Sequence, residues 1–298
     1  MASAREMRLR IRSVGNISQV TRALEAVSAS KVRRAQAAVQ ASRDYARRVV
    51  AVMQRIGEYS GGATHSLLIQ RESVENIGLA VISSDRGLAG AYNMTIARAA
   101  LAFADAKTQS ARWVTVGHKG RDLVYARGAN ITGDFNCFRG SPTFAEVTPI
   151  ARVLLDDFLS GTVDEVYVAY TDYVNTLRQT TRVERLLPLA PEMSLDHRGV
   201  PEDIGVDGPS AGYTFEPEPD KLLGELLPRF AQVQVFQAVL ESLASEHSAR
   251  MVAMRNATDN ANELSSALRL AYNKARQLAI TSDLLDIAGG AEALRQTA

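Results

Sequence analysis

The sequence has very little cysteine, few aromatic residues and no long apolar run, and each shortage excludes a class of protein. Cys137 is the single cysteine among 298 residues, which excludes a disulfide framework and a zinc site built from cysteines. We expect its thiol to be buried and inert rather than catalytic. No stretch of about 18 apolar residues occurs, so we expect no membrane-spanning helix. Aromatic residues make up only 6% of the chain and alanine is abundant, which suits long helices better than a thick core.

Proline and glycine are scarce at both ends of the chain. Residues 1–59 contain no proline and only two glycines, and the Ser-Gly-Gly that follows is a helix stop signal. Neither residue type occurs between Phe230 and Ile287. We therefore predict one long helix over residues 1–60 and another over residues 221–298, with Pro228 at the start or at a kink of the second helix and Gly289-Gly290 weakening its end.

The C-terminal segment carries a repeat typical of coiled coils. Apolar and small residues from Val233 to Leu285 follow alternating steps of three and four without a slip, and such a repeat needs a second helix to pack against. A weaker seam of mostly small residues runs from Val14 to Tyr45. Because a whole domain separates the two segments, we predict an antiparallel pair within the chain. A parallel coiled-coil dimer is the alternative.

Two polar residues, His247 and Arg250, interrupt the C-terminal seam. One interpretation is that they are exposed or set the register of the pair. The other is that they contact something outside the pair.

The middle of the chain, residues 75–190, alternates β-rich apolar runs with helical patterns. The runs are IGLAVISS, RWVTVGH, EVYVAYTDYV and TRVERLLPL, and helical stretches lie near 91–107, 118–128 and 143–160. This order predicts a mostly parallel sheet with helices on its faces. The last two runs are too close for a helical crossover, so we predict a hairpin through residues 175–180. Residues 191–220 are acidic and rich in Pro and Gly, which predicts a linker or an irregular surface loop.

Charge is distributed unevenly along a chain whose net charge is only +1. Residues 1–59 hold twelve Lys and Arg against four Asp and Glu, a net +8, whereas residues 191–220 carry a net −7. Such asymmetry indicates a partner surface, and the basic segment could meet nucleic acid or an acidic protein ring. An Arg-rich N-terminus also suits a transit peptide. We favour a basic helix of the mature protein because the helical spacing continues to about residue 45.

The segment SSDRGLAGAYN, residues 83–93, has the strand–loop–helix outline of a nucleotide site. Its glycines are spaced G-x-x-G, however, without the third glycine of a dinucleotide fingerprint, and no P-loop string occurs. Asp85 would repel a phosphate. The four histidines have no ligand at metal-binding spacing, and no nucleophile elbow is present. We therefore assign no catalytic, cofactor-binding or metal-binding residue, and keep a nucleotide-dependent enzyme and a structural coiled-coil tether as alternative functions.

Four segments carry a resemblance to a known family: IRSVGNISQVTRALEAVSASKVRRAQ, SSDRGLAGAYN, SEHSARMVAMRNATDNANEL and LAYNKARQLAITSDLLDIAGGAEAL. They resemble the gamma subunit of F-type ATP synthases, the central rotor shaft. The resemblance implies a Rossmann-like α/β domain plus a rod, an antiparallel coiled coil of the N- and C-terminal helices. It implies that the rod turns inside a ring of alpha and beta subunits and couples transmembrane proton or sodium flow to ATP synthesis. It further implies that the subunit performs no chemistry and binds no cofactor.

The same resemblance implies partners, a location and contact residues. The globular domain is expected to lie on the membrane rotor ring of c subunits, beside the epsilon subunit. The chain is then peripheral to the inner (plasma) membrane of a bacterium, on the cytoplasmic side, and binds no nucleic acid. Residues 287–294 are expected in an apolar sleeve. The residues expected to contact partner subunits are Arg276, Gln277, Thr281, Arg250, Arg86, Leu24 (where relatives often have methionine) and Asp283 (where they commonly have glutamate).

Overall fold

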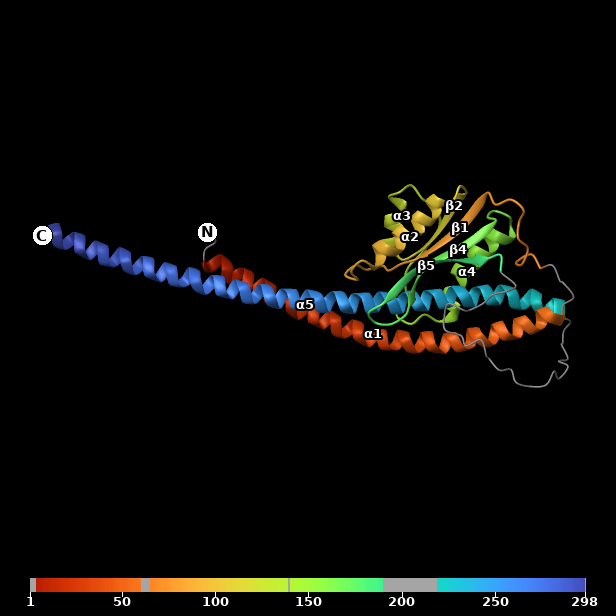
Figure 1. Ribbon diagram of the computed structural model, residues 1–298, viewed down its shortest axis with the longest axis horizontal. Coiled ribbons are helices and arrows are strands. Elements are labelled where there is room, and N and C mark those ends of the chain that lie inside the picture. Colours follow the sequence, from red (N-terminus) through yellow and green to blue (C-terminus); the bar gives the residue numbers. More distant parts are fainter. Residues whose placement is uncertain (1–3, 60–64, 139, 190–218, 298) are drawn as a thin grey trace. The chain divides into compact units, whose positions relative to one another are not determined.

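The computed structural model describes residues 4–59, 65–138, 140–189 and 219–297. It divides into two compact units, one formed by residues 1–28 with 251–298 and the other by residues 29–250 (Figure 1). The predicted acidic linker, residues 191–220, lies outside the described part of the chain apart from its last two residues. The proposed division into four sequence segments stays a prediction, since each long helix contributes residues to both units.

Two helices account for nearly half of the chain. Helix α1 spans Ala4–Tyr59 and helix α5 spans Pro219–Thr297. The scarcity of proline and glycine lets both run to this length. Helix α5 begins nine residues before Pro228, so this proline lies inside the helix rather than at its start, and the helix continues through Gly289 and Gly290. Among the described helices, none is both long and apolar enough to cross a bilayer.

In the first unit, residues 4–28 of α1 and residues 251–297 of α5 form an antiparallel helix pair. Its two members are joined by four side-chain hydrogen bonds whose partners' residue numbers add to 279 or 280, so the register does not slip. The bonds are Arg8 Nη2 to Tyr272 Oη (2.7 Å), Ser18 Oγ to Asn262 Oδ1 (2.8 Å), Thr21 Oγ1 with Thr258 Oγ1 (2.7 Å) and Arg255 Nε to Glu25 Oε1 (2.9 Å). The predicted antiparallel pairing within the chain is confirmed.

The second unit contains a five-stranded sheet in the order β3-β2-β1-β4-β5. The strands are β1 Asn76–Ile82, β2 Ser110–Val116, β3 Asn130–Phe135, β4 Glu165–Tyr173 and β5 Gln179–Leu187. Strands β1 to β4 are parallel, and β5 pairs antiparallel with β4. The mostly parallel sheet and the predicted hairpin are confirmed. Strand β3 was not predicted from the sequence, because it is an edge strand with alternating, partly exposed residues and no apolar run.

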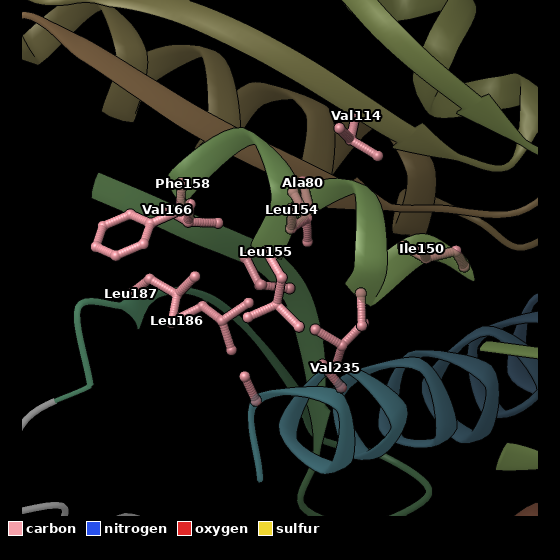
Figure 2. Packing of buried hydrophobic residues seen from close by; sticks show 14 of the residues in the cluster. Ala80, Val114, Ile150, Leu154, Leu155, Phe158, Val166, Leu186, Leu187 and Val235 are labelled. Carbon is pink, nitrogen blue, oxygen red and sulfur yellow. The ribbon is translucent and has the colours of Figure 1, made fainter. Parts of the chain in front are cut away.

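Helices cover both faces of the sheet. Alternate residues of β1 point to opposite sides: Leu79 packs in a cluster with α2 (Tyr92–Ala106) and α3 (His118–Tyr125), while Ala80 packs with α4 (Phe144–Leu159) and α5. Figure 2 shows the second cluster, in which Leu155 of α4 and Val235 of α5 lie with residues of β4 and β5. Burial on both faces explains why the central strands read as continuous apolar runs.

Candidate functional site

The crevice where a doubly wound sheet binds its ligand lies at the carboxyl ends of strands whose connections diverge. Here that place is between β1 and β4, and helix α5 fills it. Ser242 Oγ accepts a hydrogen bond from the Thr171 N–H (3.1 Å), and Ser245 Oγ donates one to the Thr171 carbonyl (3.1 Å). Tyr92 Oη donates to the Ser242 carbonyl (3.2 Å). The backbone N–H and carbonyl of Thr171, at the end of β4, are therefore bonded to the chain's own helix.

The polar side chains of the turn after β1 likewise bind backbone groups of the same chain. Ser83 Oγ accepts from the Gly120 N–H (2.9 Å), and Asp85 Oδ1 accepts from the His118 N–H (3.2 Å) and the Cys137 N–H (3.0 Å). The first amides of α3, which attract anions in nucleotide-binding folds, thus already face a serine hydroxyl and a carboxylate. A Cβ on Gly120 would lie 2.5 Å from Ser83 Oγ, so this glycine permits close packing of α3 on the turn.

A stripe of polar residues on α5 is buried against the sheet. It contains Gln237, Glu241, Ser242, Ser245, Glu246, His247 and Ser248, each less than 9% exposed. His247 was expected either to be exposed or to set the register, or else to contact something outside the pair. It is buried, so exposure is excluded. Burial, followed by the charges of Lys31 and Arg250, lowers its pKa to about 4.

Part of this stripe belongs to an ionic network that links four elements. Arg43 of α1 lies 3.4 Å from Glu241 of α5 and 3.7 Å from Asp172 of β4. Asp172 also accepts a 2.9 Å hydrogen bond from Arg182 of β5. Glu241 is fully buried, and removing one member of a buried ion pair leaves a charge that is costly to bury alone. The network therefore fixes α1 and α5 on the hairpin within this unit.

A second group surrounds Glu246. Its Oε1 lies 2.6 Å from Arg250 Nη1, and its Oε2 lies 3.9 Å from the Cys137 thiol. Burial raises the pKa of Glu246. Burial and the neighbouring carboxylates raise the pKa of Cys137 to about 12. A thiol with that pKa is protonated at neutral pH and a poor nucleophile, which agrees with the expectation of an inert cysteine.

Four of the predicted contact residues, Arg276, Gln277, Thr281 and Asp283, lie on consecutive turns of α5 and are exposed. Continuing the register of the helix pair places the start of α1, at Ala4, opposite residue 276. All residues from 276 to 291 are exposed. The predicted seam is exposed at Leu278 and Leu285, which lie beyond the part of α5 that is opposite the described residues of α1.

The exposed end of α5 is rich in large apolar side chains, of which only Leu278 and Leu285 belong to the predicted seam. They are 52–70% exposed, and they are Leu278, Ile280, Leu284, Leu285 and Ile287. Leu278 and Leu285 lie one heptad apart on one side of the helix, and the other three lie on the opposite side. Helical spacing applied beyond the start of α1 could have identified this surface.

The remaining predicted contact residues lie in different surroundings. Leu24 is half-buried in the helix pair, and the Arg86 side chain is exposed. Arg250 is mostly buried, its side chain 13% exposed, and it reaches the turn that holds Arg86. The Arg86 carbonyl accepts a 3.3 Å hydrogen bond from Arg250 Nη2. The structure thus brings two predicted residues together although they are 164 positions apart.

Comparison with known proteins gives a consistent picture. A family model described as ATP synthase matches residues 3–294. The ATP synthase gamma chain of Roseiflexus sp. (strain RS-1) is 45% identical over 99% of this chain and 100% of its own, and that of Chloroflexus aurantiacus (strain ATCC 29366) is 43% identical over 99% of both.

Solved structures show the same fold. A chain of the Euglena gracilis mitochondrial ATP synthase has a TM-score of 0.69 at 19% identity, covering 98% of this chain and 94% of that one. A chain of the Tetrahymena thermophila central stalk has a TM-score of 0.58 at 22% identity, covering 80% and 99%. The fold class is a Rossmann-like α/β domain inserted between two long paired helices. The chain belongs to the ATP synthase gamma chain family.

Proposed function

We propose that this chain is the central-stalk rotor subunit of an F-type ATP synthase. It turns inside a ring of alpha and beta subunits and couples transmembrane proton or sodium flow to ATP synthesis. Rotation presents different side chains of one asymmetric helix to each beta subunit, and this shifts the populations of their conformations. The chain itself performs no chemistry. Family membership supports this proposal, as does a ligand crevice filled by the chain's own helix.

One observation carries the proposal: a single helix that exposes large apolar side chains on opposite sides. Exposed apolar surface of this kind marks a site where other protein binds, because a surface helix of a globular domain is apolar on one stripe alone. Leu278 and Ile287 are 66% and 70% exposed. An enclosing apolar sleeve, such as the inside of a ring of subunits, buries both sides at once and still allows the helix to turn.

We infer that polar residues at the base of this segment contact the beta subunits. Arg276 and Gln277 offer a guanidinium fork and an amide, which pair with carboxylates and backbone groups. Thr281 and Asp283 follow on the next turn, and Thr281 Oγ1 bonds back to the Gln277 carbonyl (2.9 Å). In the same proposal Arg86 reaches a beta subunit from the α/β unit, and Leu24 and Arg250 lie at neighbouring contacts.

The positive charge of α1 supports an acidic protein partner. Exposed arginines in the first part of α1, which are Arg5, Arg8, Arg10, Arg12 and Arg22, suit acidic loops on an encircling protein ring, and we propose this occupant rather than nucleic acid. The α/β unit then lies on the membrane ring of c subunits beside the epsilon subunit. This location makes the chain peripheral to the inner membrane, on its cytoplasmic side.

The proposal is tested by reconstitution. The full chain is mixed with ring-forming alpha and beta subunits, and incorporation and ATPase activity are recorded. We expect one copy of the chain per ring and stimulated ATP hydrolysis. A chain that never incorporates, or one that sediments as a stable homodimer and so acts as a tether, contradicts the proposal. Saturable binding of a nucleotide by the isolated chain would instead favour the enzyme alternative.

A double substitution tests the contact residues. Arg276→Ala with Gln277→Ala removes two exposed side chains, so we expect an unchanged fold but ATP-driven ion pumping reduced about tenfold, as expected for the loss of one charged hydrogen bond. Arg269→Ala with Asn273→Ala is the matched control, because both residues are exposed on the same helix. Equal pumping by the two double variants would show that Arg276 and Gln277 are not contacts.

A further inference from the structure

The turn after β1 is tied to helix α5 by one side chain. Arg250 Nε donates to the Gly87 carbonyl, and Arg250 Nη2 donates to the carbonyls of Arg86 and Gly87, each at 3.3 Å. These groups all belong to the second unit. A guanidinium is planar and rigid, so three bonds to two successive carbonyls fix both the position and the direction of the turn.

The other side of the same guanidinium is held by helix α5 itself. Arg250 Nη1 lies 2.6 Å from Glu246 Oε1 and 3.4 Å from His247 Nδ1. Every nitrogen of the Arg250 guanidinium is therefore engaged within the chain. Glu246 is buried beside the Cys137 thiol, so its carboxylate has little freedom and can orient the arginine.

The turn that Arg250 holds is conformationally strained. Leu88 has φ +62° and is 64% exposed, and a leucine adopts this left-handed conformation only where its surroundings impose it. Because the Leu88 side chain is largely exposed, its burial does not account for the conformation. The preceding carbonyls, those of Arg86 and Gly87, are the ones that accept from Arg250. The Ser84 hydroxyl also donates to the Arg86 carbonyl (2.7 Å).

We propose that Arg250 is a positioning residue: held by Glu246, it clamps the turn of residues 85–90 to helix α5, so that Arg86 and Leu88 are presented by a turn fixed to that helix. The transmission of force through this clamp rests on the proposed rotor function, whereas the clamp itself is a property of the isolated chain. Force arriving at Arg86 then passes to α5 through the clamp as well as through strand β1. Arg250 acts on a partner subunit through the turn it holds.

Trypsin digestion of the isolated full chain tests the clamp. The Arg86–Gly87 bond lies in the clamped turn, and the Arg127–Gly128 bond lies in an exposed turn after α3 and serves as an internal reference. In Arg250→Gln we expect cleavage at Arg86 to rise about tenfold relative to cleavage at Arg127, because cleavage follows the population of the locally open turn. Arg250→Lys should rescue part of the protection, since an ammonium still donates to carbonyl groups.

Two more variants complete the design. Glu246→Gln keeps the size of the side chain but not its charge, so the arginine stays and we expect an intermediate rise of about threefold at Arg86. Arg255→Gln breaks a more exposed ion pair of the same helix, with Glu25, and should leave the ratio unchanged. If Arg250→Gln and Glu246→Gln raise cleavage at both bonds equally, or at neither, the clamp does not exist.

A second measurement uses the reconstituted complex. Glu246→Gln should incorporate normally but pump about half as many ions per ATP hydrolysed as the unmodified chain. Unchanged coupling in that variant overturns the proposed transmission through Arg250. Failure of the unmodified chain to incorporate would instead contradict the rotor function, and the digestion of the isolated chain would still decide whether the clamp exists.

Discussion

At the scale of single residues, His247 makes stability depend on pH. Its folded pKa of about 4 is below the ordinary 6.5 because burial and the positive charges of Lys31 and Arg250 oppose its protonation. The unfolded chain therefore binds more protons between these values. The stabilisation is fully present above pH 6.5 and is lost as the pH falls towards 4. Glu246, whose pKa burial raises, acts in the opposite sense.

His247→Gln isolates the histidine contribution. The free energy of unfolding in urea, measured from pH 8 to pH 4 for both chains, should fall more steeply for the unmodified chain. We expect the difference to change by about 3 kcal/mol between pH 6.5 and 4, the equivalent of the shift in pKa. Parallel curves for the two proteins would mean that His247 is protonated as readily in the folded chain as in the unfolded one.

At the scale of elements, small residues set the spacing of the helix pair. Ala261 is 7% exposed on α5, next to the hydrogen bond between Asn262 and Ser18. We expect Ala261→Leu to force the helices apart and lower the free energy of unfolding by about 1–3 kcal/mol, the usual effect of overpacking. Ala267→Leu adds the same volume at an exposed position of α5 and should have little effect. Equal destabilisation by both variants would contradict close packing at Ala261.

Some strands and helices can be predicted from the local sequence and others cannot. Strands β1, β2 and β4 are predictable because burial on both faces requires apolar runs. Strand β3 is not, since it lies at the edge of the sheet, where partial exposure removes the need for an apolar run. The length of α5 follows from its composition, whereas the end of its pairing depends on where α1 begins, at Ala4.

At the scale of the whole molecule, we expect the exposed part of α5, residues 276–291, to add little to the stability of this chain. Residues 276–291 are exposed, so a chain that ends at residue 282 should keep its thermal midpoint within about 2 °C but lose affinity for partner subunits. A chain that ends at residue 261 loses part of the helix pair and should be less stable. A large drop for the first truncation, recorded by calorimetry, would mean that this segment packs within the chain.

The sequence by itself determined the two long helices, the mostly parallel sheet with its hairpin and the family, because composition, periodicity and whole-length similarity are properties of the linear chain. It also supplied the predicted contact residues, through resemblance. Only the tertiary structure decided that α5 fills the ligand crevice, that His247 is buried, that Leu278 and Leu285 are exposed and that Arg250 binds the carbonyls of Arg86 and Gly87. These facts depend on groups that are far apart in sequence, and burial and hydrogen bonding between such groups are set by packing in three dimensions rather than by local pattern.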